Sequence, residues 1–129
     1  MKALVLVLAL APTLVLAGPW TPLAKEQDRT LLLDHGSVRA SDGSRKAWTM
    51  ESHRKPQTTP DGKQYLSVRS QHSYACDAAT RTLLAQAFYA EVLGKGEPVG
   101  TFKYESYDPE VIAPGSLAEK ALKAVCKKR

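Results

Sequence analysis

Two cysteines and three histidines are the residues best suited to covalent or metal chemistry. Cys76 and Cys126 stand alone in the sequence, and neither belongs to a CxxC pair, which excludes a zinc finger and an iron–sulfur cluster. His35, His53 and His72 lack the spacing of a metal site. We therefore predict no metal site and expect histidines scattered over the surface or rim. The cysteines form either a disulfide or, alternatively, reactive thiols or metal ligands.

The sequence contains no motif for nucleophilic catalysis or phosphate binding. No serine stands in a GxSxG or SxxK motif. Gly94-Lys95-Gly96 lacks the strand–glycine–helix context of a phosphate loop, so a hairpin turn explains it. We predict no catalytic residue, no cofactor and a protein that is not an enzyme.

Basic side chains are the remaining candidates for a binding function. The 129-residue chain carries 18 Lys and Arg against 13 Asp and Glu, a net charge of +5. No aromatic-rich RNA motif accompanies them, so nucleic acid is not an expected partner. A solvated surface of modest charge is the preferred interpretation. If the surface does bind a polyanion or macromolecule, the candidate contacts are the cations without an evident structural role: Arg54, Lys55, Lys63, Lys127, Lys128 and Arg129.

The start of the chain has the pattern of a secretory signal peptide. Lys2 precedes an apolar run from Ala3 to Leu16, and Val15-Leu16-Ala17 offers a cleavage site. A retained membrane anchor is the alternative, but the run is shorter than the ~20 residues of a spanning helix, and Pro12 interrupts it. We expect cleavage after Ala17 and no later membrane span. No cysteine follows that could carry a lipid.

The remaining residues, 18–129, have the length and composition of one globular domain. Apolar residues make up 43% of the sequence and charged residues 24%, which is ordinary for a folded protein. Without Lys2 the domain keeps 17 basic and 13 acidic side chains, a net charge of +4. The protein is expected in the periplasm or secreted, with the cell surface also open.

Export favours a disulfide between the two cysteines. Thiols outside the cytoplasm tend to oxidise, and Cys76 and Cys126 are the only pair available. Closing a loop of this length stabilises the fold by about 4 kcal/mol in the chain-entropy model.

Alternating apolar residues predict a series of strands. The expected strands cover 20–23 at an edge because of Pro22, then 30–33, 45–53, 64–76 and 99–104. Residues 41–44 and 94–98 are expected turns, and Arg54 to Lys63 an expected loop, because this segment contains Pro56 and Pro60. Residues 81–91 fit either a helix or a strand, and the neighbouring strands favour a strand.

A helix is predicted at the C-terminal end. Ser116 and Glu119 form a capping box, and apolar side chains from Leu117 to Cys126 follow at helical spacing. Cys126 then lies on the apolar face of the helix and Cys76 on the apolar face of its strand, which supports their pairing. We predict an α+β fold: an antiparallel sheet of five or six strands with this helix packed on it and tied by the disulfide.

An ordered set of residues spans nearly the whole predicted domain. It consists of Asp34, Ser37-Val38-Arg39, Trp48, Tyr65-Leu66-Ser67, Tyr74-Ala75-Cys76, Arg81-Thr82, Tyr89, Val111 to Ser116 and Cys126. In this order the chain resembles the bacterial surface-adhesin protein E-like family. The resemblance implies an antiparallel sheet with a disulfide-tied C-terminal helix, and adhesion to host matrix or plasma proteins.

Two functions from different classes follow. The first is a non-enzymatic binding domain that attaches to a host macromolecule or an envelope polyanion. The second is a small periplasmic hydrolase or hydrolase inhibitor, which requires His35, His53 or His72 beside a carboxylate in a pocket. We also expect no dedicated small-molecule pocket, because a domain of this size needs its apolar residues for one core.

Overall fold

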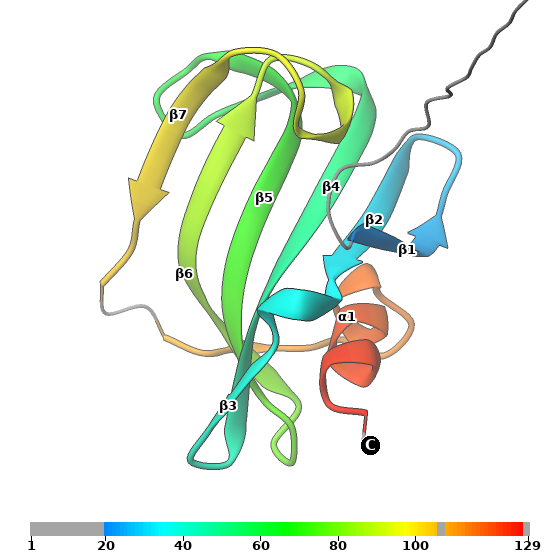
Figure 1. The fold of residues 1–129 in the computed structure, drawn as a ribbon, viewed down its shortest axis with the longest axis vertical. Helices are drawn as coiled ribbons and strands as arrows, with labels where there is room; N and C mark the ends of the chain where they lie inside the picture. The colour runs from blue at the N-terminus through cyan, green and yellow to red at the C-terminus, as the bar shows by residue number, and fades with distance from the viewer. Residues whose placement is uncertain (1–19, 106–107, 128–129) are drawn as a thin grey trace, which may run out of the picture.

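One curved antiparallel sheet and one α-helix make up the fold (Figure 1). A computed structural model describes residues 20–105 and 108–127. The strands are β1 (Trp20–Lys25), β2 (Arg29–Asp34), β3 (Arg39–Ser41), β4 (Ser44–Thr58), β5 (Gln64–Ala75), β6 (Thr80–Tyr89), β7 (Pro98–Lys103) and β8 (Glu110–Val111). The helix is α1 (Leu117–Val125), and two short 3-10 helices are η1 (His35–Ser37) and η2 (Val92–Gly94).

The strands are ordered β1-β2-β4-β5-β6-β7, with β3 paired to β4 and β8 paired to β6. The α+β class is confirmed, but the strand number is wrong: the described residues form eight strands, not five or six. Strands β3 and β8 account for the excess. They have three and two residues, too few to show an alternating pattern, and they exist because longer neighbours provide a partner edge.

The first half of the predicted loop from Arg54 to Lys63 is strand. Strand β4 continues to Thr58, and the turn to β5 is confined to the residues that follow. The β4–β5 register shifts between Ser52 and Gln57, which indicates a bulge or irregularity. Pro56 lies inside this irregular stretch, where its missing N–H costs no regular ladder hydrogen bond. The ambiguous segment 81–91 is the strand β6, as favoured.

Helix α1 covers one face of the sheet at its β1–β2–β4 end (Figure 1). We call this the helix face, and it carries Leu33, Ala47 and Tyr74, each fully buried. Three helix residues four apart, Leu117, Ala121 and Val125, complete the core with them. This spacing places them on a single stripe, as the sequence predicts.

The predicted cap and disulfide are both present. Ser116 Oγ accepts from the Glu119 amide at 3.2 Å, and Glu119 Oε1 accepts from the Gly115 amide at 2.9 Å. Glu119 thus reaches one residue further back than the usual capping box. Cys126, at the helix C-terminus, is bonded to Cys76, which follows β5, with their Cα atoms 5.7 Å apart.

The expected signal peptide, residues 1–17, lies outside the described residues. Within the described ranges, no helix has the length and apolar character needed to span a membrane.

Candidate functional site

The structure does not bring the sequence-predicted cations together. Lys55 and Lys63 lie near the β4–β5 turn, where Thr58 faces Gln64. Lys127 lies beyond Cys126 at the opposite end of β4, where Ser44 faces Ala75. The 15 residues of β4 separate these ends by roughly 45 Å at about 3.3 Å per residue. The four described cations of the set therefore do not form one patch, and Lys128 and Arg129 lie outside the described residues.

Arg54 has a structural partner that the sequence did not reveal. Its Nη1 donates to the Gln27 carbonyl at 3.0 Å, and its own amide donates to the Asp28 carbonyl at 3.0 Å. Arg54 therefore fastens the β1–β2 turn to β4. Lys63 Nζ lies 3.9 Å from Asp61 Oδ2, an exposed pair that contributes little. The assumption that these cations lack a structural role is wrong for Arg54.

Other cations do meet, on the sheet face opposite α1, which we call the outer face. Arg39 and Lys46 face each other across the β3–β4 pair, and both are exposed. They line a cavity of about 420 Å³, the basic cavity, whose full lining is Ser37, Arg39, Ser41, Lys46, Trp48 and Gln71. None of these described residues is acidic. The site depends on the β3–β4 register, so no local pattern in the sequence predicts it.

Trp48 is held in the basic cavity by a stack of aromatic and cationic groups. The Arg69 guanidinium lies 5.2 Å from the Trp48 ring centroid and 5.5 Å from that of Trp20. Arg69 Nη1 also donates to the Tyr89 hydroxyl at 3.4 Å. Cation–π contacts of this kind fix the ring positions, so Trp48 presents an ordered aromatic wall beside two exposed cations.

A second cavity of about 300 Å³ lies on the helix face. We call it the helix-side cavity, and strands β2, β4, β5, β6 and β8 and the start of α1 enclose it. Its lining is Leu31, Thr49, Glu51, His53, Tyr65, Val68, Ser70, His72, Arg81, Leu83, Gln86, Glu110, Leu117 and Ala118. No dedicated small-molecule pocket is expected from the sequence; α1 covers only part of its face, and the rest of that face carries this hollow.

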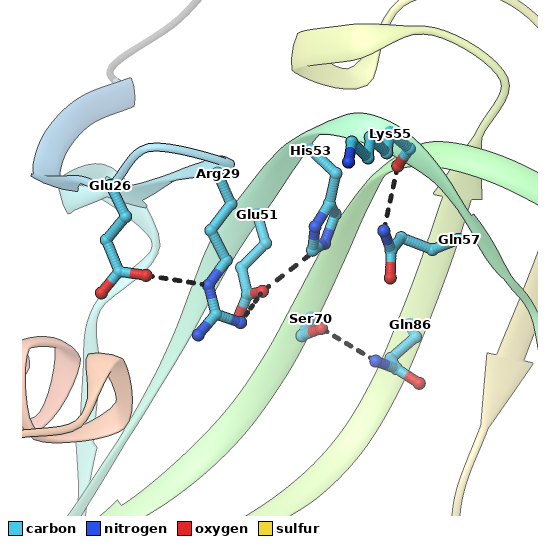
Figure 2. A network of polar contacts seen from close by, with 8 residues as sticks. All are labelled: Glu26, Arg29, Glu51, His53, Lys55, Gln57, Ser70 and Gln86. Atoms are coloured by element: carbon cyan, nitrogen blue, oxygen red, sulfur yellow. Dashed lines mark hydrogen bonds and ion pairs between the residues drawn. The ribbon is translucent and has the colours of Figure 1, made fainter.

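The charged groups of the helix-side cavity are paired with one another. Arg81 Nε lies 3.1 Å from Glu110 Oε1. Glu51 Oε1 lies 3.5 Å from Arg29 Nη1 and 3.6 Å from His53 Nε2, and Figure 2 shows these three side chains converging. Each carboxylate in the wall thus has a basic neighbour, so the lining has no unpaired carboxylate.

The two histidines of this cavity are held neutral. Burial lowers the pKa of His53, opposed by the nearby Glu51 carboxylate. Burial, and then the Arg81 charge, lower the pKa of His72 to about 3. His72 is only 7% exposed, so the prediction of surface or rim histidines is wrong for it. In the sheet it lies opposite Ala47 on β4 and Leu83 on β6.

The arrangement does not complete a hydrolase site. His53 beside Glu51 in a cavity meets the condition set by the sequence for a hydrolase. Glu51 is shared with Arg29, however, and no hydrogen bond links His53 to a serine, threonine or cysteine within residues 20–105 and 108–127. A nucleophile–base pair is the required element of covalent hydrolase catalysis. The same ranges also contain no group of three or more metal-ligating side chains.

The geometry defines a small disulfide-tied α+β domain with two polar cavities. The chain belongs to the surface-adhesin protein E family, whose family model matches residues 20–127. No curated protein matches the sequence.

Solved structures of Haemophilus influenzae protein E share the fold. One has a TM-score of 0.64 and 20% identity, covering 91% of this chain and 90% of that one. Crystal form II has a TM-score of 0.66 and 19% identity, covering 93% and 96%. Protein E from non-typeable Haemophilus influenzae has a TM-score of 0.60 and 19% identity, covering 90% and 80%. At these identities the likeness establishes the architecture.

Proposed function

We propose that this chain is an exported, non-enzymatic binding domain that attaches to acidic polysaccharide outside the cytoplasm. Membership of a surface-adhesin family supports a binding role at or beyond the cell envelope. The observation that carries the choice of ligand is the basic cavity, where Arg39 and Lys46 stand exposed beside Trp48.

The side chains of the basic cavity suit sulfate or carboxylate groups. Arg39 Nη1 donates to the Gly36 and Val38 carbonyls at 2.8 and 2.9 Å, which orders the guanidinium before a ligand arrives. Preorganisation of this kind reduces the entropy lost on binding. Lys46 adds a second charge, and Trp48 offers a flat apolar surface for a sugar ring.

The cations predicted from the sequence have a secondary place in this proposal. Lys55 and Lys63 near the β4–β5 turn, and Lys127 at the other end of the molecule, are proposed as peripheral contacts for a long polymer. Lys128 and Arg129 extend the Lys127 group in the sequence. Arg54 is not included, because its guanidinium holds the β1–β2 turn.

Binding to immobilised heparin by surface plasmon resonance tests the proposal. The wild-type protein should bind at low salt and release as the Debye length falls from ~10 Å to ~3 Å. The double variant Arg39→Ser/Lys46→Ser should bind at least tenfold more weakly. Lys55→Ser/Lys63→Ser removes the same charge elsewhere and should have a smaller effect, and Lys120→Ser, on the exposed side of α1, should have none.

Two results would overturn this function. One is the absence of binding to heparin or to an acidic envelope polysaccharide at low salt. The other is binding that neither salt nor Arg39→Ser/Lys46→Ser alters. Salt-independent binding to a host matrix protein would instead identify a protein ligand, and the basic cavity would not be the binding site.

A further inference from the structure

The floor of the helix-side cavity is a row of uncharged polar side chains. Thr49, Ser70 and Gln86 face one another on three neighbouring strands, β4, β5 and β6. Gln86 Nε2 donates to Ser70 Oγ at 3.1 Å (Figure 2), and Gln86 Oε1 accepts from the Tyr104 hydroxyl at 2.8 Å. These bonds fix the amide and leave Ser70 able to donate its own proton.

A buried hydrogen-bonding atom without a partner lies beside this row. Within the described residues, His72 Nδ1 has no hydrogen bond, although it is covered. His72 lines the cavity and is more than nine-tenths buried. An unsatisfied buried polar atom costs about 1–3 kcal/mol, so the imidazole is a candidate contact for a polar ligand that displaces it slightly.

The charges of the lining are already paired. Arg81 is paired with Glu110, and Glu51 is shared by Arg29 and His53. The lining therefore offers an ionic ligand no unpaired charge, which favours an uncharged ligand. The remaining groups are hydroxyls, an amide and neutral imidazoles, which together donate and accept hydrogen bonds.

The size and apolar parts of the cavity restrict the ligand further. At about 300 Å³ the cavity is at the lower end of the range for small-molecule sites, about 300–1,000 Å³. Leu31, Val68 and Leu83 contribute apolar wall. The Tyr65 ring is fixed by an edge contact with Phe88, at 4.7 Å between centroids. A compact ring that carries hydroxyls on its rim and C–H groups on its faces matches these walls.

From this combination we propose that the helix-side cavity binds an uncharged saccharide unit, such as the end of a neutral glycan. Thr49, Ser70 and Gln86 bind its hydroxyls, His72 supplies a further polar contact, and Tyr65 packs on its C–H face. This site is on the opposite face of the sheet from the basic cavity and is independent of it.

The test is an NMR titration of the full domain, with amide and side-chain resonances recorded against single neutral sugars. The probes are glucose, galactose, mannose and their N-acetylated amines, with glucuronate as the acidic counterpart. We expect saturable shifts at Ser70, His72 and Gln86 for at least one neutral sugar, unchanged by salt, and a much weaker response to glucuronate.

Variants distinguish a loss of sugar binding at this cavity from a loss of folding. Gln86→Leu and Ser70→Ala should each weaken the binding at least tenfold while the spectrum keeps its folded dispersion. Gln64→Leu, the same change at an exposed β5 position, should leave the affinity unchanged. Arg39→Ser/Lys46→Ser should also leave it unchanged, so failure of the heparin experiment and failure of this one are distinguishable.

The proposal is overturned if no neutral sugar gives saturable shifts at these residues. It is equally overturned if glucuronate binds more tightly than every neutral sugar in a salt-dependent manner, or if Gln86→Leu and Ser70→Ala both bind as the wild type does.

Discussion

His72 is the residue whose burial most clearly costs the fold free energy. Its ring lies on the helix face between Ala47 and Leu83, and its Nδ1 has no hydrogen-bond partner among the described residues. An apolar side chain of similar size would avoid this cost. The choice of histidine is explained if the imidazole serves the cavity that it lines.

The depressed pKa of His72 predicts a loss of stability in acid. Its pKa is about 3 in the folded chain against 6.5 in a model peptide, so the unfolded chain binds a proton first. The stability due to neutral His72 is complete above pH 6.5 and is lost as pH falls toward 3. Between pH 7 and pH 5 the wild type should lose about 2 kcal/mol of unfolding free energy through this group.

Urea denaturation at pH 7, 6 and 5 measures the effect. His72→Leu should be at least as stable as the wild type at pH 7, and its advantage should grow as pH falls. His35→Leu, the same substitution at an exposed position, is the control. A parallel pH dependence in wild type and His72→Leu would show that His72 is not held neutral.

At the scale of elements, helix α1 depends on local interactions. Ser116→Ala removes the oxygen that accepts from the Glu119 amide and should lower the unfolding free energy by about 1 kcal/mol. Ser41→Ala, at an exposed position in β3, should change it by much less. Chemical denaturation checks both, and a Ser116→Ala variant as stable as the wild type would contradict the cap.

Local pattern explains which elements the sequence predicts. The helix features depend only on nearby residues, so the spacing of the sequence is enough to predict them: the cap at Ser116 and the buried positions Leu117, Ala121 and Val125. The main strands follow from alternation in the same way. Strands β3 and β8 form because they pair with β4 and β6. A segment of two or three residues is too short for its sequence to show which strand it pairs with.

The candidate sites required contacts that no local pattern contains. Arg39 and Lys46 come together only through the register of β3 on β4. Arg81 meets Glu110 only because β8 pairs with β6. The sequence does not predict the partner of Arg54, because the Gln27 carbonyl lies 27 residues away along the chain. The composition indicates a basic surface, but the pairing of the strands determines where the basic side chains cluster.

At the scale of the whole molecule, the disulfide ties the two ends of the core. Cys76 follows β5 and Cys126 ends α1, 50 residues apart. Cys76→Ser/Cys126→Ser should therefore lower the unfolding free energy by ~2–5 kcal/mol, since the unfolded chain gains conformational freedom.

Thermal unfolding with and without reductant measures the same quantity in the wild type. The double variant should melt well below the oxidised wild type and should not respond to reductant. Titration of the unfolded, unreduced wild type should detect no thiol, and two titratable thiols would contradict the bond.

Export of the domain is the remaining prediction at this scale. The Val15-Leu16-Ala17 pattern predicts a mature chain that begins at Gly18, outside the described residues. Intact mass of the protein recovered from source cells, followed by protease treatment of those cells, distinguishes a surface protein from a periplasmic one. A mass that retains residues 1–17 would indicate a membrane anchor instead.

The central claim is that acidic polysaccharide binds at the basic cavity. An NMR titration with a defined heparin fragment tests it most directly, because each contact residue reports separately. We predict that the largest shifts occur at Arg39, Lys46 and the Trp48 indole N–H, and that they diminish at high salt. Shifts concentrated at Lys55 and Lys63, or none anywhere, would contradict the account.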